Sequence, residues 1–77
     1  MSYLVWEMCK KYGWANLRDS SNGLVFDVCY IRQVENGLWI GEYMSPHRID
    51  RIKFPGEYPL EELKAVLETT ITLLEAK

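Results

Sequence analysis

The chain has 77 residues, of which 48% are hydrophobic, and its formal net charge is −2. This length predicts one small globular domain over residues 1–77, and the hydrophobic fraction argues against intrinsic disorder. The acidic balance argues against a duplex-DNA-binding domain, which is expected to be basic. Two cysteines, Cys9 and Cys29, are too few for a disulfide scaffold and lack metal-ligand spacing. With no signal peptide and no apolar run of roughly 20 residues, we expect a cytoplasmic protein with no membrane contact.

The first segment, residues 2–12, predicts a helix. Ser2 can cap its start, and Gly13 suits the position just after its end. Residues 14–23 are expected to form a loop, because the run DSSNG is rich in turn-forming residues. The apolar residues of the first segment share one helical stripe: Leu4, Val5, Met8, Cys9 and Tyr12.

A β-hairpin is predicted next, with strands over residues 24–34 and 38–44. Asn36-Gly37 lies between two runs of β-branched and aromatic residues, the strongest short-range hairpin signal. Read as a two-residue turn, it places Val34 opposite Trp39 and Tyr30 opposite Tyr43. One face of the hairpin then carries Phe26, Val28, Tyr30, Val34, Trp39 and Tyr43, and the other carries Val25, Cys29, Ile31, Ile40 and Met44.

Residues 47–54 predict a third, shorter strand whose charges suit a sheet edge. Residues 59–76 predict the clearest helix, beginning at Pro59, with Leu60, Leu63, Leu67, Ile71 and Leu74 on one stripe. The expected fold is therefore α+β: a helix, a three-stranded antiparallel meander and a second helix. The C-terminal helix is expected to pack on one face of the sheet.

Catalytic chemistry has little support in the sequence. The one histidine, His47, has no motif around it that would supply a nucleophile and an oxyanion donor. Glu61 and Glu62 stand at a helix start, where the helix dipole accounts for them. No glycine-rich phosphate loop is present. We therefore expect a non-enzymatic domain without cofactor or metal.

Aromatic and basic residues on the hairpin and the third strand are the best candidates for partner binding. The aromatic residues can instead form part of the hydrophobic core beneath a helix, because rows of aromatic side chains are usually buried. We expect Phe26 and Tyr30 to be mostly buried, and Trp39 and Tyr43 to be partly exposed. The candidate partner-binding residues are Trp39, Tyr43, Tyr30, Arg32, Arg48, Arg51 and Lys53.

The favoured function is protein–protein contact by a small regulator or inhibitor. The compact, acidic chain would suit a phage or a mobile element, and a homodimer is compatible with it. The alternative is a single-stranded nucleic-acid-binding domain, in which bases stack on an aromatic sheet face beside basic residues.

Two family resemblances accompany these patterns. The expected order of helix, three strands and helix resembles the double-stranded-RNA-binding domain, although Glu57, Glu61 and Glu62 stand where that family has phosphate-binding lysines. The stretch 26–67 resembles the positive-coactivator family of single-stranded-DNA binders. GEYM, the Ser45-Pro46 turn, RIKF and PLEELKAVL follow that family's strand–turn–strand–helix order, and Gly41-Glu42 departs from its paired basic and aromatic strand motif.

Overall fold

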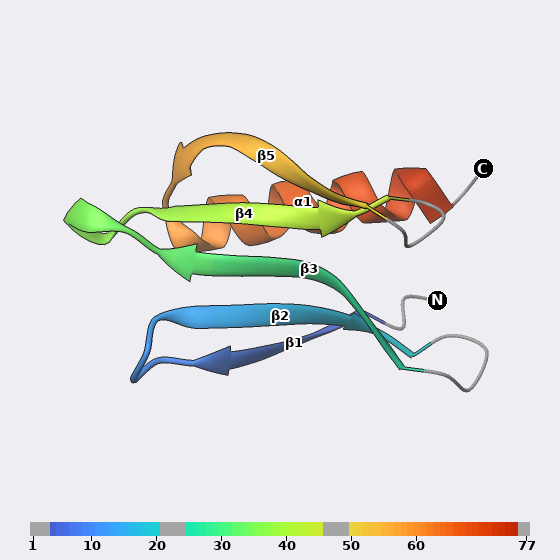
Figure 1. Cartoon of the computed structure of the whole chain (residues 1–77), viewed down its shortest axis with the longest axis horizontal. Helices are drawn as coiled ribbons and strands as arrows, with labels where there is room; N and C mark the ends of the chain where they lie inside the picture. Colours follow the sequence, from blue (N-terminus) through green and yellow to red (C-terminus); the bar gives the residue numbers. More distant parts are fainter. Residues whose placement is uncertain (1–3, 21–24, 46–49, 76–77) are drawn as a thin grey trace.

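The structure is a computed structural model that describes residues 4–20, 25–45 and 50–75. These residues form an antiparallel meander of five strands, in the spatial order β1-β2-β3-β4-β5, followed by one α-helix (Figure 1). The elements are β1 (Leu4–Cys9), β2 (Trp14–Asp19), β3 (Phe26–Gln33), β4 (Trp39–Met44), β5 (Arg51–Tyr58) and α1 (Leu60–Glu75). A short 3-10 turn, Glu35–Gly37, joins β3 to β4.

The predicted order of helix, three-stranded meander and helix is wrong, although the class is α+β. Residues 4–9 form strand β1, not a helix. The stretch LVWEMC fits the helical repeat of 3.6 residues and also the strand repeat of two residues, because its apolar residues alternate between the two faces of a strand. Leu4, Trp6 and Met8 turn toward the core, whereas Val5 and Glu7 are exposed.

The predicted loop over residues 14–23 contains the interior strand β2. Its two neighbours β1 and β3 supply hydrogen-bonding partners on both sides, which overrides the weak strand propensity of WANLRD. Ala15 and Leu17 are fully buried, and Asp19 is buried at the end of the strand. Residues 21–24 of the predicted loop lie outside the described residues.

The β3–β4 hairpin forms, but its predicted register is wrong by one residue. Gln33, not Val34, pairs with Trp39, and Cys29 pairs with Tyr43. The cause is a three-residue loop, closed by the Val34 N–H donating to the Leu38 carbonyl over 2.7 Å. Asn36 and Gly37 both have positive φ, which these two residue types tolerate well. A slip of one residue exchanges the faces of a strand, so the predicted aromatic face does not exist.

The third predicted strand is displaced toward the C-terminus, because β5 covers Arg51–Tyr58 where residues 47–54 were expected. Pro55 and Gly56 lie inside this strand and do not end it, which a sheet edge permits because a proline there breaks no ladder. Residues 47–49, including His47 and Arg48, lie outside the described residues. The C-terminal helix is present as Leu60–Glu75, and its Leu63, Leu67 and Ile71 are buried as the stripe predicts.

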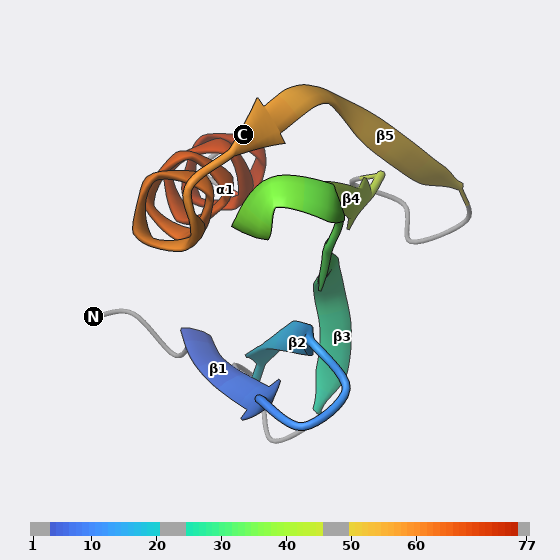
Figure 2. The ribbon, with the colours of Figure 1, turned by 90° about the vertical axis from the view of Figure 1, so that its left-hand side faces the viewer.

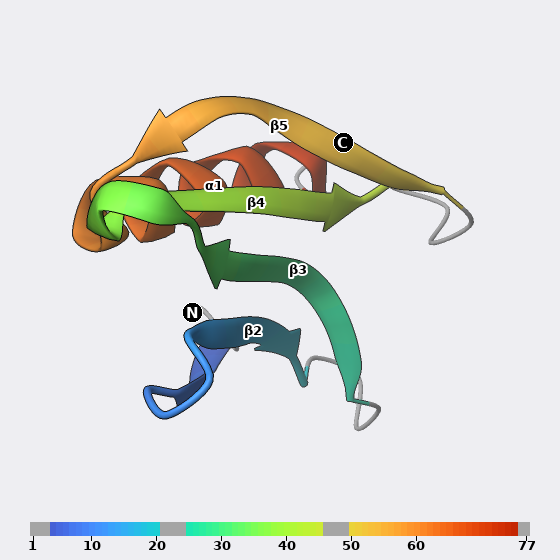
Figure 3. The same ribbon diagram turned by 60° about the vertical axis from the view of Figure 1, so that its left-hand side comes forward.

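The sheet is strongly curled, and α1 lies inside the curve beside β4, with β1 and β2 at the other end of the curl (Figures 2 and 3). We call the side that faces α1 the inner face. The helix approaches closely at Gly41: a Cβ added there would lie 2.9 Å from Leu67 Cδ1 and 3.1 Å from Ile31 Cγ2. Glycine at this position therefore lets β4 and α1 pack in direct contact.

Candidate functional site

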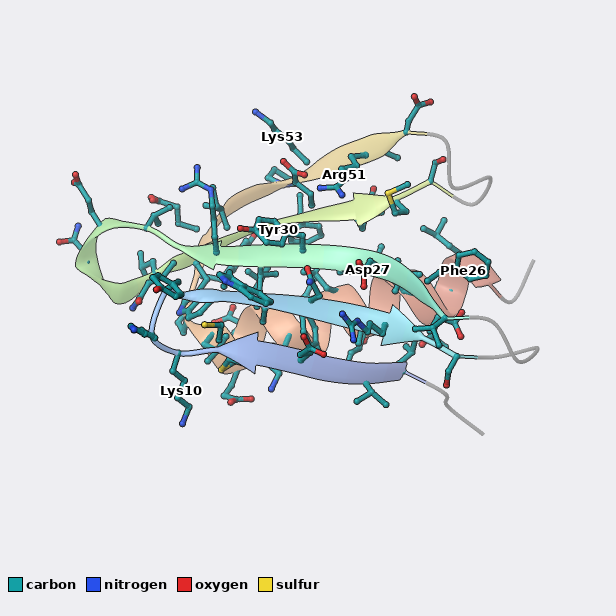
Figure 4. The ribbon with its side chains drawn as sticks, turned by 60° about the horizontal axis from the view of Figure 1, so that its bottom comes forward. Lys10, Phe26, Asp27, Tyr30, Arg51 and Lys53 are labelled. Atoms are coloured by element: carbon teal, nitrogen blue, oxygen red, sulfur yellow. The ribbon has the colours of Figure 1, made fainter. Side chains whose placement is uncertain are left out.

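The side of the sheet that does not face α1, which we call the outer face, has no helix or strand over it in the described chain (Figure 4). Side chains alternate along each strand, so the register assigns its members. They are partly or fully exposed, in contrast to the buried residues between them. The outer face comprises Val5, Glu7, Cys9, Trp14, Asn16, Arg18, Asp27, Tyr30, Arg32, Ile40, Glu42, Met44, Arg51 and Lys53.

One row of this face crosses the whole sheet, from β1 to β5. Glu7 pairs with Asn16, Asn16 with Tyr30, Tyr30 with Glu42, and Glu42 with Lys53. Directly opposed residues have Cβ atoms roughly 5 Å apart, so neighbouring side chains in the row lie side by side. Tyr30 is the aromatic residue at its centre, with an amide on one side and a carboxylate on the other.

A groove of about 500 Å³ lies on the outer face beside Tyr30, between β3 and β5. Tyr30, Arg32, Ile40, Lys53 and Pro55 contribute to its lining. Such a volume can accommodate one or two side chains of a partner molecule. A much smaller adjoining hollow, of about 30 Å³, lies where Asn16, Asp27, Tyr30 and Arg51 meet.

Ion pairs neutralise much of the charge on this face. The Arg18 guanidinium donates from Nη1 to Glu7 Oε2 at 2.7 Å and from Nε to Asp27 Oδ1 at 3.1 Å. Arg51 Nη1 lies 3.8 Å from Glu42 Oε2. Arg32 and Lys53 have no ion pair within the described part of the chain. They are therefore the cations that a partner can engage without displacing an internal carboxylate.

The structure brings together Tyr30, Arg32, Arg51 and Lys53 of the predicted partner-binding residues. Figure 4 shows Tyr30, Arg51 and Lys53 on the near side of the sheet, with α1 behind it. Arg32 follows two residues after Tyr30 on β3, so it shares this face, and it is exposed.

Trp39 and Tyr43 lie on the opposite, inner face. Trp39 is only 6% exposed and belongs to the core, so the expectation that it is partly exposed is wrong. Tyr43 is partly buried and packs edge-on against Phe54, with ring centroids 6.5 Å apart. Phe26, expected to be mostly buried, is exposed at the start of β3. Arg48 lies outside the described residues.

Strand β2 adds site residues that the sequence interpretation missed, since it treated this stretch as a loop. Trp14, Asn16 and Arg18 alternate with the buried Ala15 and Leu17 and so lie on the outer face. That alternation was readable in WANLRD. Trp14 pairs directly with Arg32, which places a second aromatic ring beside a basic side chain.

The two cysteines, Cys9 and Cys29, lie in strands β1 and β3. Burial, with a further contribution from the nearby Glu68 charge, raises the pKa of the Cys29 thiol to about 12, so this group stays protonated at neutral pH. Cys9 and Cys29 are both free thiols. Within the described residues, no group of three or more His, Cys, Asp and Glu side chains is placed to hold a metal ion.

Comparisons with known protein families, with curated proteins and with solved structures found no match. The order of strands before the helix also removes the basis for the resemblance to the double-stranded-RNA-binding domain, which rested on an N-terminal helix. None of the helical residues described is part of a stretch long and apolar enough to cross a membrane.

Proposed function

We propose that this protein is a non-enzymatic regulatory or inhibitory domain that binds a protein partner through the outer face of its sheet. The observation that carries the proposal is the composition of this face. Aromatic and aliphatic side chains, Tyr30 and Ile40 among them, line a groove of about 500 Å³, and charges of both signs surround it. Protein interfaces combine apolar contacts with a polar surround in this way.

The arrangement of charge favours a protein over nucleic acid. A phosphate backbone is bound by cations that are free to neutralise it. Here Arg18 is already held by two carboxylates, and Arg51 lies beside Glu42. Phosphates on this face would meet Glu7, Asp27 and Glu42 as well as the cations. A polypeptide can instead present an apolar side chain to the groove and a carboxylate to Lys53 or Arg32.

The test is affinity capture from nuclease-treated host lysate with matched variants. Tyr30→Ala removes the central ring, and Lys53→Glu reverses a free charge beside the groove. Lys10→Glu makes the same charge change at the β1–β2 turn, away from the groove, and serves as the control (Figure 4). We expect a protein captured by the parent and by Lys10→Glu but lost with both outer-face variants. Equal capture by all four proteins would contradict the proposal.

The free cysteines favour a reducing compartment, so we infer that the protein acts in the cytoplasm. Measuring the number of reactive thiols in protein purified from cells under non-reducing conditions tests this inference. Two reactive thiols per unfolded chain are expected, and a recovered disulfide would contradict it.

A second candidate function is single-stranded nucleic-acid binding on the same face. It is favoured by Trp14 lying directly opposite Arg32, with Tyr30 on the next strand position of that face. Bases can stack on such rings, and base–aromatic stacking contributes about 1–3 kcal/mol per base. Fluorescence anisotropy with a labelled single-stranded oligonucleotide separates the two functions. Tight binding that weakens steeply with salt would favour nucleic acid.

A further inference from the structure

Trp6 joins the two ends of the curled sheet on its inner side. α1 lies beside β4 at one end of the curl, and β1 lies at the other end (Figure 2). The Trp6 ring nevertheless reaches the helix: its Nε1 donates to Glu68 Oε1 at 2.6 Å, and Lys64 Nζ lies 5.6 Å from its centroid. We call these contacts of Trp6 with Lys64 and Glu68 the clasp.

A buried thiol lies next to the clasp. Trp6 pairs with Leu17, and Leu17 pairs with Cys29, so the three side chains form one row on the inner face of β1, β2 and β3. Burial raises the pKa of the Cys29 thiol, and the charge of Glu68 adds to this rise. Glu68 therefore acts on both ends of the row, on Trp6 through a hydrogen bond and on Cys29 through its charge.

The Cys29 thiol is shielded from solvent by the elements that cover the inner face. β3 is an interior strand, with β2 hydrogen-bonded on one side and β4 on the other. Cys29 is 2% exposed and belongs to the buried cluster against which Trp6 packs. A reagent in solution therefore reaches the sulfur of Cys29 only when β1 or α1 moves away from the inner face.

Of these two elements, β1 is held less firmly. α1 buries Leu63, Leu67 and Ile71 and approaches β4 closely. None of the six residues of β1 is fully buried, and β2 is its only neighbouring strand in the described chain. Elements with few buried apolar contacts open at a lower free energy than the whole domain. The clasp strengthens this weak attachment, because a hydrogen bond to a carboxylate is stronger than one between neutral groups.

We propose that the clasp controls access to the Cys29 thiol. When the clasp is intact, β1 is docked on α1 and the thiol is shielded. When the clasp breaks, β1 and its Trp6 ring move away from α1, while β3, β4, β5 and α1 stay folded. Cys29 then becomes accessible from the inner face.

Exposure also makes this thiol more reactive. In the closed form the pKa of Cys29 is raised to about 12, so the thiolate that attacks electrophiles is scarce at neutral pH. Contact with water removes the desolvation and returns the pKa toward 9.0. Access and ionisation change in the same direction, so the reaction rate of Cys29 reports the open form.

Alkylation of the native protein by iodoacetamide at increasing urea concentration tests the opening. The thiolate sulfur forms a bond to carbon and iodide leaves. Digestion after lysine and arginine separates Cys29 from Cys9, because Lys10, Lys11 and Arg18 lie between them. The dependence on urea measures the surface exposed in the reactive form. We expect the Cys29 rate in the parent protein to rise much less steeply with urea than the unfolded fraction does. Equal dependences would overturn the proposal, because Cys29 would then react only from the unfolded chain.

Two variants break the clasp from opposite sides. Trp6→Phe removes the N–H donor and keeps the Glu68 charge, whereas Glu68→Ala removes the acceptor. Each should raise the rate of Cys29 alkylation without urea by roughly tenfold, a change that a hydrogen bond to a charged group supports. The matched controls are Trp14→Phe on the outer face and Glu62→Ala at an exposed position of α1. Both controls should react at the rate of the parent.

Global destabilisation is distinguished by two further measurements. Urea denaturation gives the unfolded fraction of each variant, and the added alkylation of Trp6→Phe should exceed this fraction. Amide hydrogen exchange should become faster in β1 of Trp6→Phe, while β4 and β5 keep the rates of the parent. The proposal is refuted if Trp6→Phe reacts no faster than Trp14→Phe, or if exchange accelerates equally in all five strands.

Discussion

The two faces of the sheet differ in burial, and the proposed partner contact lies on the more exposed one. The inner face holds fully buried apolar side chains, including Leu17 and Ile31, under the buried stripe of α1. The outer face holds exposed or half-exposed side chains and solvent-accessible ion pairs. Burial of apolar area supplies most of the folding free energy, and surface ion pairs supply little. Substitutions on the outer face should therefore change binding with little cost to stability.

The largest expected contrast is between two aromatic residues on opposite faces. Trp39→Ala should lower the free energy of unfolding by about 3–5 kcal/mol, because it empties a buried site. Tyr30→Ala should lower it by about 1 kcal/mol or less, because Tyr30 borders an open groove. Urea denaturation of the two variants measures both values. A Tyr30→Ala protein as unstable as Trp39→Ala would remove the distinction between the faces.

Neighbouring residues of β4 sharpen the same comparison. Gly41→Ala should cost about 1–3 kcal/mol, because the new methyl group would lie 2.9 Å from Leu67 Cδ1. Glu42→Ala, one residue later on the outer face, removes only an exposed ion pair to Arg51 and should cost about 1 kcal/mol or less. Thermal melting compares them. Equal melting temperatures for Gly41→Ala and the parent would show that α1 does not approach β4 as described.

Titration of the buried thiol gives a pH-dependent test of the inner face. Folding raises the Cys29 pKa from 9.0 to about 12, so the unfolded chain loses this proton first as pH rises. The protonated thiol contributes fully to stability below pH about 9, and this contribution is lost progressively up to pH about 12. The free energy of unfolding should fall by no more than about 1.4 kcal/mol per pH unit from this group. Urea denaturation from pH 8 to 10.5 should show a shallower decline for Cys29→Ala than for the parent. Parallel declines would place the thiol in contact with water.

The smallest expected effect concerns the ion pairs of the outer face. Arg18→Gln breaks the contacts to Glu7 and Asp27, all three of which are substantially exposed. The free energy of unfolding should fall by about 1 kcal/mol or less, and this difference should shrink in molar salt. Denaturation at low and high salt measures it. A loss of several kcal/mol that persists in high salt would mean that Arg18 supports the fold.

The strongest periodic signal in the sequence predicted the C-terminal helix, because the apolar stripe through Leu63 and Leu67 fits only a helix over so long a segment. Six residues are too few to distinguish a helix from a strand by the spacing of apolar residues. LVWEMC was therefore predicted as part of a helix, but it forms a strand. β2 was missed because its conformation depends on two neighbouring strands, which local propensity does not register.

The candidate site was predicted only in part, since it depends on the hairpin register. Asn36-Gly37 correctly marked the turn, but loop length decides which residues face each other. One residue of difference moved Trp39 into the core and put Tyr30 on the outer face beside Lys53. The basic residues of β5 were identified correctly because charged side chains are typical of an edge strand. This indication does not depend on how the hairpin strands pair.

The most direct test of the division between the two faces is the β3–β4 register in solution. Cross-strand nuclear Overhauser effects should connect Ile31 with Gly41 and Gln33 with Trp39. The same spectra should connect the Trp39 and Gly41 backbones with side chains of the inner face. Contacts of Arg32 with Gly41 and of Val34 with Trp39 would contradict the account, because they would place Trp39 and Tyr30 on one face.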